Sequence, residues 1–165
     1  WLIKYTEGIM DTDAISDMVY GELFIPLEVV PQSEPFVISK KWTFVKGMKE
    51  VLASYTCHFQ QPFWTNDFDV EGNIRSITFP NRTKFTETLL QETPYGYSYS
   101  GEGMDGIHGY RGSFNVDNST DEKVELTLHI TFQYESADSF IKMTTIVGDF
   151  FQQVENALNS NFTAH

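Results

Sequence analysis

Arg75 and Glu87 are the charged residues whose positions most suggest chemistry, because both alternate with apolar residues on predicted strands. A lone charge in a dry interior is costly, so two charges on the same face of adjacent strands should pair. The pair is either a polar anchor or acid/base element facing a ligand, or a structural cross-strand ion pair, which we favour. Their apolar neighbours on these faces are Ile77 and Phe79 on the first strand, and Phe85 and Leu89 on the second.

Three tyrosines on later predicted strands are further candidates. The hydroxyls of Tyr97, Tyr99 and Tyr110 can bind a ligand or donate a proton to an enolate. Tyrosines in such strands also commonly fill a core with the hydroxyl hydrogen-bonded to the protein. The sequence leaves both roles open.

The histidines and the single cysteine do not predict a metal or nucleophilic site. His58, His108, His129 and His165 lack metal-ligand spacing. Cys57 adjoins His58, but sequence neighbours on a helix do not face each other, so we expect a buried thiol. We therefore expect no metal and no cofactor.

Composition limits the class of protein. The chain has 165 residues, of which 41% are hydrophobic and 15% aromatic, enough for one domain with a sizeable core. Its formal net charge of −12 repels phosphate backbones, so we expect no nucleic-acid partner. No apolar run reaches the roughly 20 residues needed to cross a bilayer. The compartment and the oligomeric state are not determined by the sequence; the cytoplasm is the default expectation.

Hydrophobic periodicity predicts the elements that hold these residues. From Gly72 onward the period is two, which predicts an antiparallel meander. The last strand is the clearest, because apolar Val124 to Phe132 alternate with polar residues. A long amphipathic helix, about Ala137 to Asn161, closes the chain. The predicted strands are Asn73–Phe79, Lys84–Gln91, Tyr95–Ser100, Gly109–Val116 and Lys123–Tyr134.

The first part of the chain has weaker patterns. Asp11-Thr12-Asp13 can cap a helix within residues 1–21, which we expect to be an N-terminal extension to a domain at 22–165. Glu22–Val30 predicts a strand, followed by a turn at Pro31–Pro35. Apolar spacings of three and four over Phe36–Tyr55 predict one or two helices, broken near Gly47.

Several segments, in this order and spacing, resemble the START-like helix-grip superfamily, and most closely its polyketide cyclase/dehydrase-like and lipid-carrier branch. The resemblance implies an α+β fold in which a curved antiparallel sheet of about six strands wraps around the long C-terminal helix. It also implies that Leu27–Pro35 is the strand-to-helix connection of that family. The segments are Gly72–Phe79, Thr86–Leu89, Tyr97–Ser100, Gly109–Phe114 and Phe151–Leu158.

The resemblance further implies an internal cavity and the residues that line it. A carrier or sensor for a hydrophobic or aromatic small molecule is the expected function, with Gly101–Gly109 as a candidate gate beside the cavity. A long hairpin connection without a gating role is the alternative for that loop. The implied lining residues are Arg75, Ile77, Phe79, Phe85, Glu87, Leu89, Tyr97, Tyr99, Tyr110, Leu128, Ile130, Met143, Val147, and Phe150 or Phe151.

Two other functions stay open. A cyclase, aromatase or dehydratase, a lyase or isomerase without metal, would use Glu87 as base and Tyr110 or Arg75 to stabilise an oxyanion. An assembly subunit without a cavity would use residues 1–21 and an acidic surface to bind a basic partner. A cone-shaped fold like that of nuclear transport factors also has N-terminal helices before a curved sheet, but it usually lacks the long closing helix.

Overall fold

The computed structural model describes residues 9–10 and 34–162, and its central feature is one mixed sheet. The strand order is β1-β2-β8-β7-β6-β5-β4-β3. Every pair of neighbouring strands is antiparallel except the short β1, which pairs parallel to β2. The strands are β1 (Ile9–Met10), β2 (Phe36–Val45), β3 (Phe68–Glu71), β4 (Ile74–Thr78), β5 (Lys84–Thr93), β6 (Gly96–Glu102), β7 (Ile107–Thr120) and β8 (Lys123–Tyr134). The helices are α2 (Lys49–Thr56) and α3 (Ala137–Asn161).

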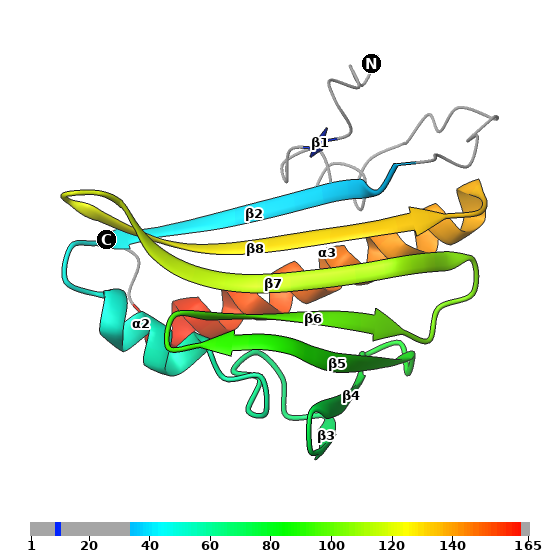
Figure 1. Cartoon of the computed structure of the whole chain (residues 1–165), viewed down its shortest axis with the longest axis horizontal. Helices are drawn as coiled ribbons and strands as arrows, with labels where there is room; N and C mark the ends of the chain where they lie inside the picture. The colour runs from blue at the N-terminus through cyan, green and yellow to red at the C-terminus, as the bar shows by residue number, and fades with distance from the viewer. Residues whose placement is uncertain (1–8, 11–33, 163–165) are drawn as a thin grey trace.

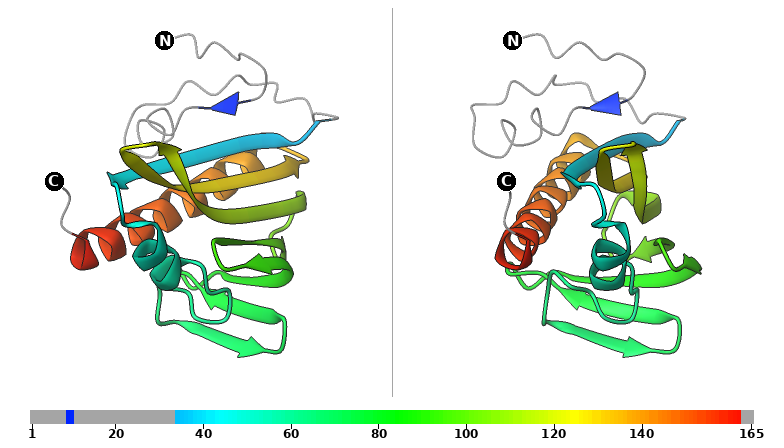
Figure 2. Two further views of the ribbon diagram at one scale, coloured as in Figure 1. Left: turned by 60° about the vertical axis from the view of Figure 1, so that its left-hand side comes forward. Right: turned by 90° about the vertical axis from the view of Figure 1, so that its left-hand side faces the viewer.

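The sheet curves around α3, which lies along its concave face (Figure 1). Figure 2 shows the wrapping from the side, with α2 beside one end of the sheet. The buried residues of the strands and of α3 form one hydrophobic cluster between the two layers. This is the helix grip that the sequence predicts, and it places the inward side chains of neighbouring strands around one interior.

The meander and the closing helix confirm the sequence predictions. β8 and α3 have the predicted bounds, and the other four predicted strands differ from the structure by a few residues at their ends. The structure shows a capping box at the start of α3: the Ser136 hydroxyl accepts from the backbone N–H of Ser139, whose hydroxyl accepts from Ser136 N–H.

The prediction for Phe36–Tyr55 is wrong for its first half. Residues 36–45 form β2, and only 49–56 form a helix. β2 pairs with β8 in an unbroken register from Phe36↔Phe132 to Val45↔Lys123, so pairing with the best-defined strand overrides the helical spacing. The strand-to-helix connection is therefore Lys46-Gly47-Met48 and not Leu27–Pro35.

The remaining N-terminal predictions fall mostly outside the described residues. Ile9 and Met10, which belong to the expected N-terminal helical extension and precede its predicted cap, form β1 and pair with Val37 and Ile38. The rest of residues 1–21, the strand at Glu22–Val30 and most of the turn at Pro31–Pro35 lie outside the described part of the chain.

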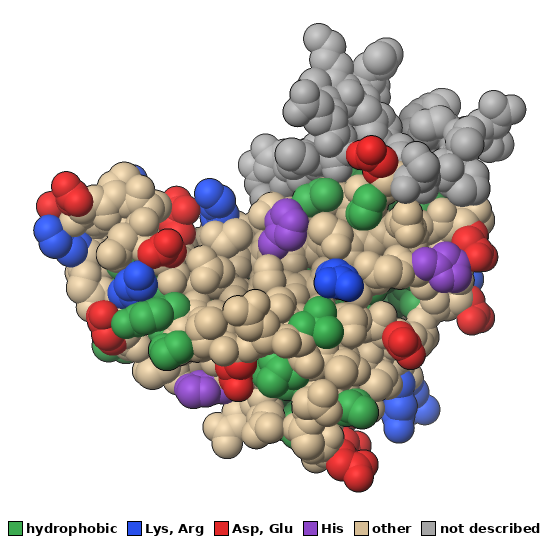
Figure 3. All heavy atoms as spheres, in the orientation of Figure 1, with side chains coloured by type: hydrophobic (Ala, Val, Ile, Leu, Met, Phe, Trp, Pro, Cys, Tyr) green, Lys and Arg blue, Asp and Glu red, His purple; other side chains and the backbone are tan. Residues whose placement is uncertain are grey.

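The convex face of the sheet carries short polar side chains. Cross-strand neighbours there include Thr88 beside Ser100, and Ser98 beside Ser113, which in turn lies beside His129. Figure 3 shows this face, where hydrophobic side chains are scattered and do not gather into a patch. His129 is exposed, as its parity predicts, so the apolar alternate residues of β8 point toward α3.

Candidate functional site

Arg75 and Glu87 form a buried ion pair between β4 and β5. They are direct cross-strand partners, and Arg75 Nε donates to Glu87 Oε2 over 2.5 Å. Arg75 is 0% exposed and Glu87 is 4% exposed. Arg75 Nη1 also donates to the backbone carbonyl of Phe59 over 2.6 Å. The pairing predicted from strand parity and from the cost of a lone buried charge is therefore present.

Aromatic rings enclose the guanidinium group. Its carbon lies 4.3 Å from the ring centroid of Phe59 and 5.4 Å from those of both Tyr97 and Tyr99. These contacts are in the range of cation–π attraction, which is strongest where water is excluded. The surroundings thus stabilise the positive charge of Arg75 from more than one side.

Three polar atoms of this cluster lack hydrogen bonds. Within residues 9–10 and 34–162, no group bonds to Arg75 Nη2, Tyr97 Oη or Tyr99 Oη, although all three atoms are buried. An unsatisfied buried donor costs about 1–3 kcal/mol, so native interiors contain few of them. Three such atoms within one set of contacting side chains mark the Arg75 cluster (Arg75, Glu87, Tyr97 and Tyr99) as the candidate site.

Burial sets the protonation of the cluster. It raises the pKa of the Glu87 carboxyl, while Arg75 opposes this shift by charge and by hydrogen bond. Burial acts to lower the pKa of Arg75, but Tyr97 and Glu87 raise it, and the net direction is upward. Burial also raises the pKa of Tyr99 and Tyr110. The tyrosines are therefore neutral hydrogen-bond donors near neutral pH.

We expect the folded protein to lose stability at alkaline pH because of Tyr97. Burial raises its pKa to about 12, whereas an exposed tyrosine has a pKa of about 10. The unfolded chain then releases the proton first, so this titration leaves the free energy of unfolding unchanged below pH 10 and lowers it as pH rises toward 12. Urea unfolding at pH 8, 10 and 11 should show falling stability, and Tyr97→Phe should flatten this trend. An equal decline in Tyr97→Phe would contradict it.

The residues implied as cavity lining do face one interior. All are buried except Leu89, which is half-buried. Their rings contact one another: Phe85 of β5 and Tyr110 of β7 are 4.8 Å apart between centroids, and Tyr97 and Tyr99, both on β6, are 5.9 Å apart. The buried members are Arg75, Ile77, Phe79, Phe85, Glu87, Tyr97, Tyr99, Tyr110, Leu128, Ile130, Met143, Val147, Phe150 and Phe151.

A segment that the sequence does not predict adds aromatic rings to this interior. Residues 57–67, between α2 and β3, place Phe59 and Trp64 among the lining residues. Trp64 stacks on Phe79 at 6.1 Å and contacts Phe150 at 4.4 Å between centroids. The segment has no periodicity; its only sequence signal is a high density of aromatic residues. The buried thiol of Cys57, whose pKa is raised by burial, lies at its start.

Two inward glycines make room for the aromatic rings. A Cβ on Gly112 would lie 2.3 Å from the Oη and Cζ atoms of Tyr99, its cross-strand partner. A Cβ on Gly101 would lie 2.3 Å from the ring of Phe85. The absence of these side chains allows the rings to lie flat against the sheet.

The Gly101–Gly109 segment is shorter as a loop than the sequence suggests. Strands extend to Glu102 and from Ile107, and the intervening turn lies against the start of α3. Glu135 N–H donates to the carbonyl of Gly106 over 2.9 Å, and His108 Nε2 lies 2.5 Å from Glu135 Oε1. The turn is thus hydrogen-bonded to the connection between β8 and α3 in this structure, and a gating role stays a prediction.

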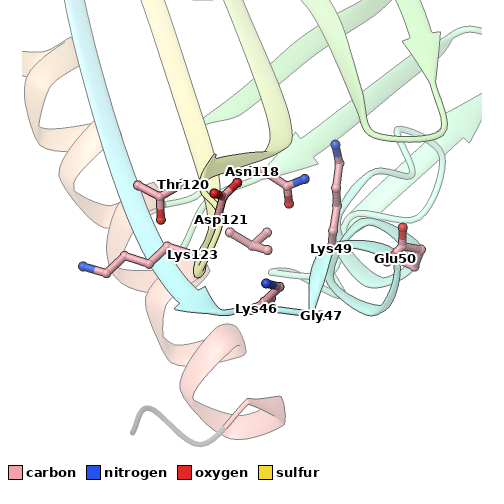
Figure 4. A pocket seen from close by; sticks show the side chains of 9 residues that line it. Lys46, Gly47, Lys49, Glu50, Asn118, Thr120, Asp121 and Lys123 are labelled. Atoms are coloured by element: carbon pink, nitrogen blue, oxygen red, sulfur yellow. The ribbon is translucent and has the colours of Figure 1, made fainter.

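A charged pocket of about 540 Å³ lies at the tip of the β7–β8 hairpin. Lys46, Lys49 and Lys123 line it, together with Glu50 and Asp121 (Figure 4). The ammonium groups of Lys49 and Lys123 point away from each other in this view, so they do not converge on one anion. Lys49 instead binds Asp117 over 2.9 Å. Most residues that line this pocket are charged or polar, so it does not suit the expected hydrophobic ligand.

No group of three or more His, Cys, Asp or Glu side chains in residues 9–10 and 34–162 is arranged to hold a metal ion. No helix within those residues is both long and apolar enough to span a bilayer.

Solved structures of other proteins share the fold of this chain. No family model and no curated protein sequence matches the chain. An uncharacterized protein from Bacillus thuringiensis matches with a TM-score of 0.61 at 16% identity, covering 78% of this chain and 99% of its own. A START superfamily protein from Mycobacterium smegmatis matches with a TM-score of 0.53 at 12% identity, covering 75% and 94%.

A plant enzyme has the same fold at lower identity. Norcoclaurine synthase from Thalictrum flavum matches with a TM-score of 0.55 at 10% identity, covering 88% of this chain and all of its own. Identities this low support the fold and leave the activity open. The curved sheet, the long closing helix and these matches together show that the chain has the START-like, Bet v 1-like helix-grip fold.

Proposed function

We propose that the protein is a carrier or sensor for a small molecule with an aromatic or apolar body and a hydrogen-bond-accepting group. The ligand would lie between α3 and the sheet, with its acceptor at the Arg75 cluster. The single observation that carries this proposal is the group of unpaired buried atoms at Arg75 Nη2, Tyr97 Oη and Tyr99 Oη, within the described residues. A carboxylate or carbonyl oxygen would satisfy these donors and repay part of their desolvation.

The apolar body of the ligand needs the space that Phe59 and Trp64 occupy. Hydrogen bonds hold the start of the segment at 57–67, where Arg75 Nη1 donates to the Phe59 carbonyl and Phe59 N–H donates to Glu92. Ring contacts hold the rest: Phe63 lies against Phe114 at 5.7 Å, and Trp64 lies against Phe150. An aromatic ligand can replace such contacts one for one. We therefore expect the ligand to displace the Trp64 side chain. The buried apolar area would then stay nearly constant, while the unpaired polar atoms of the Arg75 cluster would gain hydrogen bonds.

Naphthalene-2-carboxylate is a suitable probe, with 2-naphthylmethylammonium as its partner of opposite charge. Calorimetry should show saturable binding of the carboxylate only, because Arg75 and the tyrosine hydroxyls are donors. Tyr97→Phe should weaken binding about five- to tenfold, the loss of one hydrogen bond of about 1 kcal/mol. The same variant should be as stable as the parent or more so, since it removes an unpaired buried hydroxyl.

Tyr95→Phe is the matched control, because Tyr95 is 38% exposed and lies outside the interior. It should change neither binding nor stability. Equal binding of both probes, or unchanged affinity in Tyr97→Phe, would contradict the proposed orientation of the ligand. Absence of any binding to the parent protein would contradict the proposed function itself.

A second candidate is an assembly subunit without a cavity. The near-complete burial of the lining residues favours it, because Trp64 already fills the space between Phe79 and Phe150. The enzyme alternative depends on Glu87, whose carboxylate is bound to Arg75 in this structure. Turnover of a cyclisable substrate that disappears in Glu87→Gln would support it.

A further inference from the structure

A second concavity lies outside the interior, between the end of β2 and the last turns of α3. This β2–α3 groove has a volume of about 780 Å³, within the range of roughly 300–1,000 Å³ usual for small-molecule sites. Its apolar lining comes from Trp42, Phe44, Val45, Met48, Leu158 and Phe162. Trp42 and Phe44 are alternate residues of β2, so their side chains lie on the same face of the strand.

The floor of the groove is aromatic. The ring of Phe162 lies 5.9 Å from that of Phe44 and 5.2 Å from that of Tyr55, and Trp42 lies edge-on to Phe151 at 6.4 Å. The Trp42 Nε1 atom is buried, and no acceptor within the described residues bonds to it. The groove therefore has an aromatic floor, and the unpaired Trp42 Nε1 lies buried beneath it.

Positive charge lies at the rim of the groove in a protein whose formal net charge is −12. Lys41, also a lining residue, pairs with Glu125 at 3.4 Å, and the lining residue Glu122 pairs with Lys46 at 3.4 Å. Lys123 has no ion-pair partner within residues 9–10 and 34–162. This uncompensated cation lies at the rim of the groove, on the face of the sheet opposite to Trp42 and Phe44, and is complementary to the head of an anionic amphiphile at that rim.

We propose that the β2–α3 groove binds a free single-chain amphiphile with a carboxylate head. Its tail lies on Phe44, Leu158 and Phe162, and its head lies beside Lys123. This site is separate from the Arg75 cluster, and its existence does not depend on the proposed function.

The test uses dodecanoate below its micelle concentration, with dodecyltrimethylammonium as the probe with the same tail and the opposite head. In a Trp1→Phe/Trp64→Phe protein the only remaining tryptophan is Trp42, whose fluorescence reports on the groove. Dodecanoate should shift its emission saturably, and the ammonium probe should bind at least tenfold more weakly. Lys123→Glu should weaken dodecanoate about tenfold, and Phe162→Asp should abolish the shift.

Lys84→Glu is the matched charge reversal, because Lys84 is exposed on β5 and is not a lining residue of the groove. It should leave dodecanoate affinity unchanged. The proposal is overturned if both probes bind equally, if Lys84→Glu and Lys123→Glu have equal effects, or if binding occurs only to dodecanoate-containing vesicles. A Trp1→Phe/Trp42→Phe protein retains only Trp64. If dodecanoate shifts the emission of Trp64 in that protein but does not shift the emission of Trp42 in the first one, the proposal is also overturned.

Discussion

Glu87→Leu should destabilise the protein by about 3–5 kcal/mol, the usual loss when one partner of a buried ion pair is removed. Arg75 would stay charged and fully buried without a counter-ion, since its guanidinium cannot deprotonate. The remaining bond to the Phe59 carbonyl and the surrounding rings would compensate only part of this cost. Urea unfolding followed by circular dichroism measures the loss.

The double variant Arg75→Met/Glu87→Leu separates charge from packing. Apolar residues of similar volume often replace a buried ion pair at little net cost, so the double variant should recover most of the lost stability. The matched surface pair is Lys46 and Glu122, whose side chains are 66% and 79% exposed. Glu122→Leu should change stability by less than about 0.5 kcal/mol. A similarly small loss in Glu87→Leu would mean that water reaches the pair.

The same pair shows what a sequence can determine about a site. Parity alone placed Arg75 and Glu87 on one face of neighbouring strands, and the cost of an isolated buried charge then required them to meet. The structure has them as direct partners in the register of β4 and β5. Strand alternation and burial cost are local or pairwise rules, so they can be applied before a fold is known.

β2 shows where periodicity fails. Its apolar residues include Val37 and Val45, which point away from the interior, as well as inward Phe36 and Ile38. This two-sided pattern imitates helical spacing, and the pairing with β8 that settles the outcome joins residues about 90 positions apart. Trp64 could not be placed either, because an irregular segment has no period from which its orientation follows.

Trp64→Ala is the second change with a large expected effect, a loss of about 3–5 kcal/mol. Trp64 is 6% exposed and is held between Phe79 and Phe150, so its removal leaves an apolar void beneath α3. Indole should refill this void and restore stability, by about 2.7 kcal/mol at a concentration 100 times its dissociation constant. Thermal unfolding with and without indole measures both effects.

Trp42→Ala is the control, because Trp42 lines an open groove and is only partly buried. It should cost less stability, and indole should restore none of it. If Trp64→Ala loses less than about 1 kcal/mol and does not respond to indole, Trp64 does not fill the interior in solution.

The same variant decides how a ligand would share the interior with the chain. If binding exchanges Trp64 for the ligand, the parent protein must first displace the indole, and part of the affinity is spent on that step. Trp64→Ala removes this cost, so naphthalene-2-carboxylate should bind it more tightly than the parent. If Trp64 instead forms a wall of the occupied site, the variant should bind the probe more weakly, because it loses a stacking surface. The direction of this one change in affinity therefore separates a competing side chain from a contributing one.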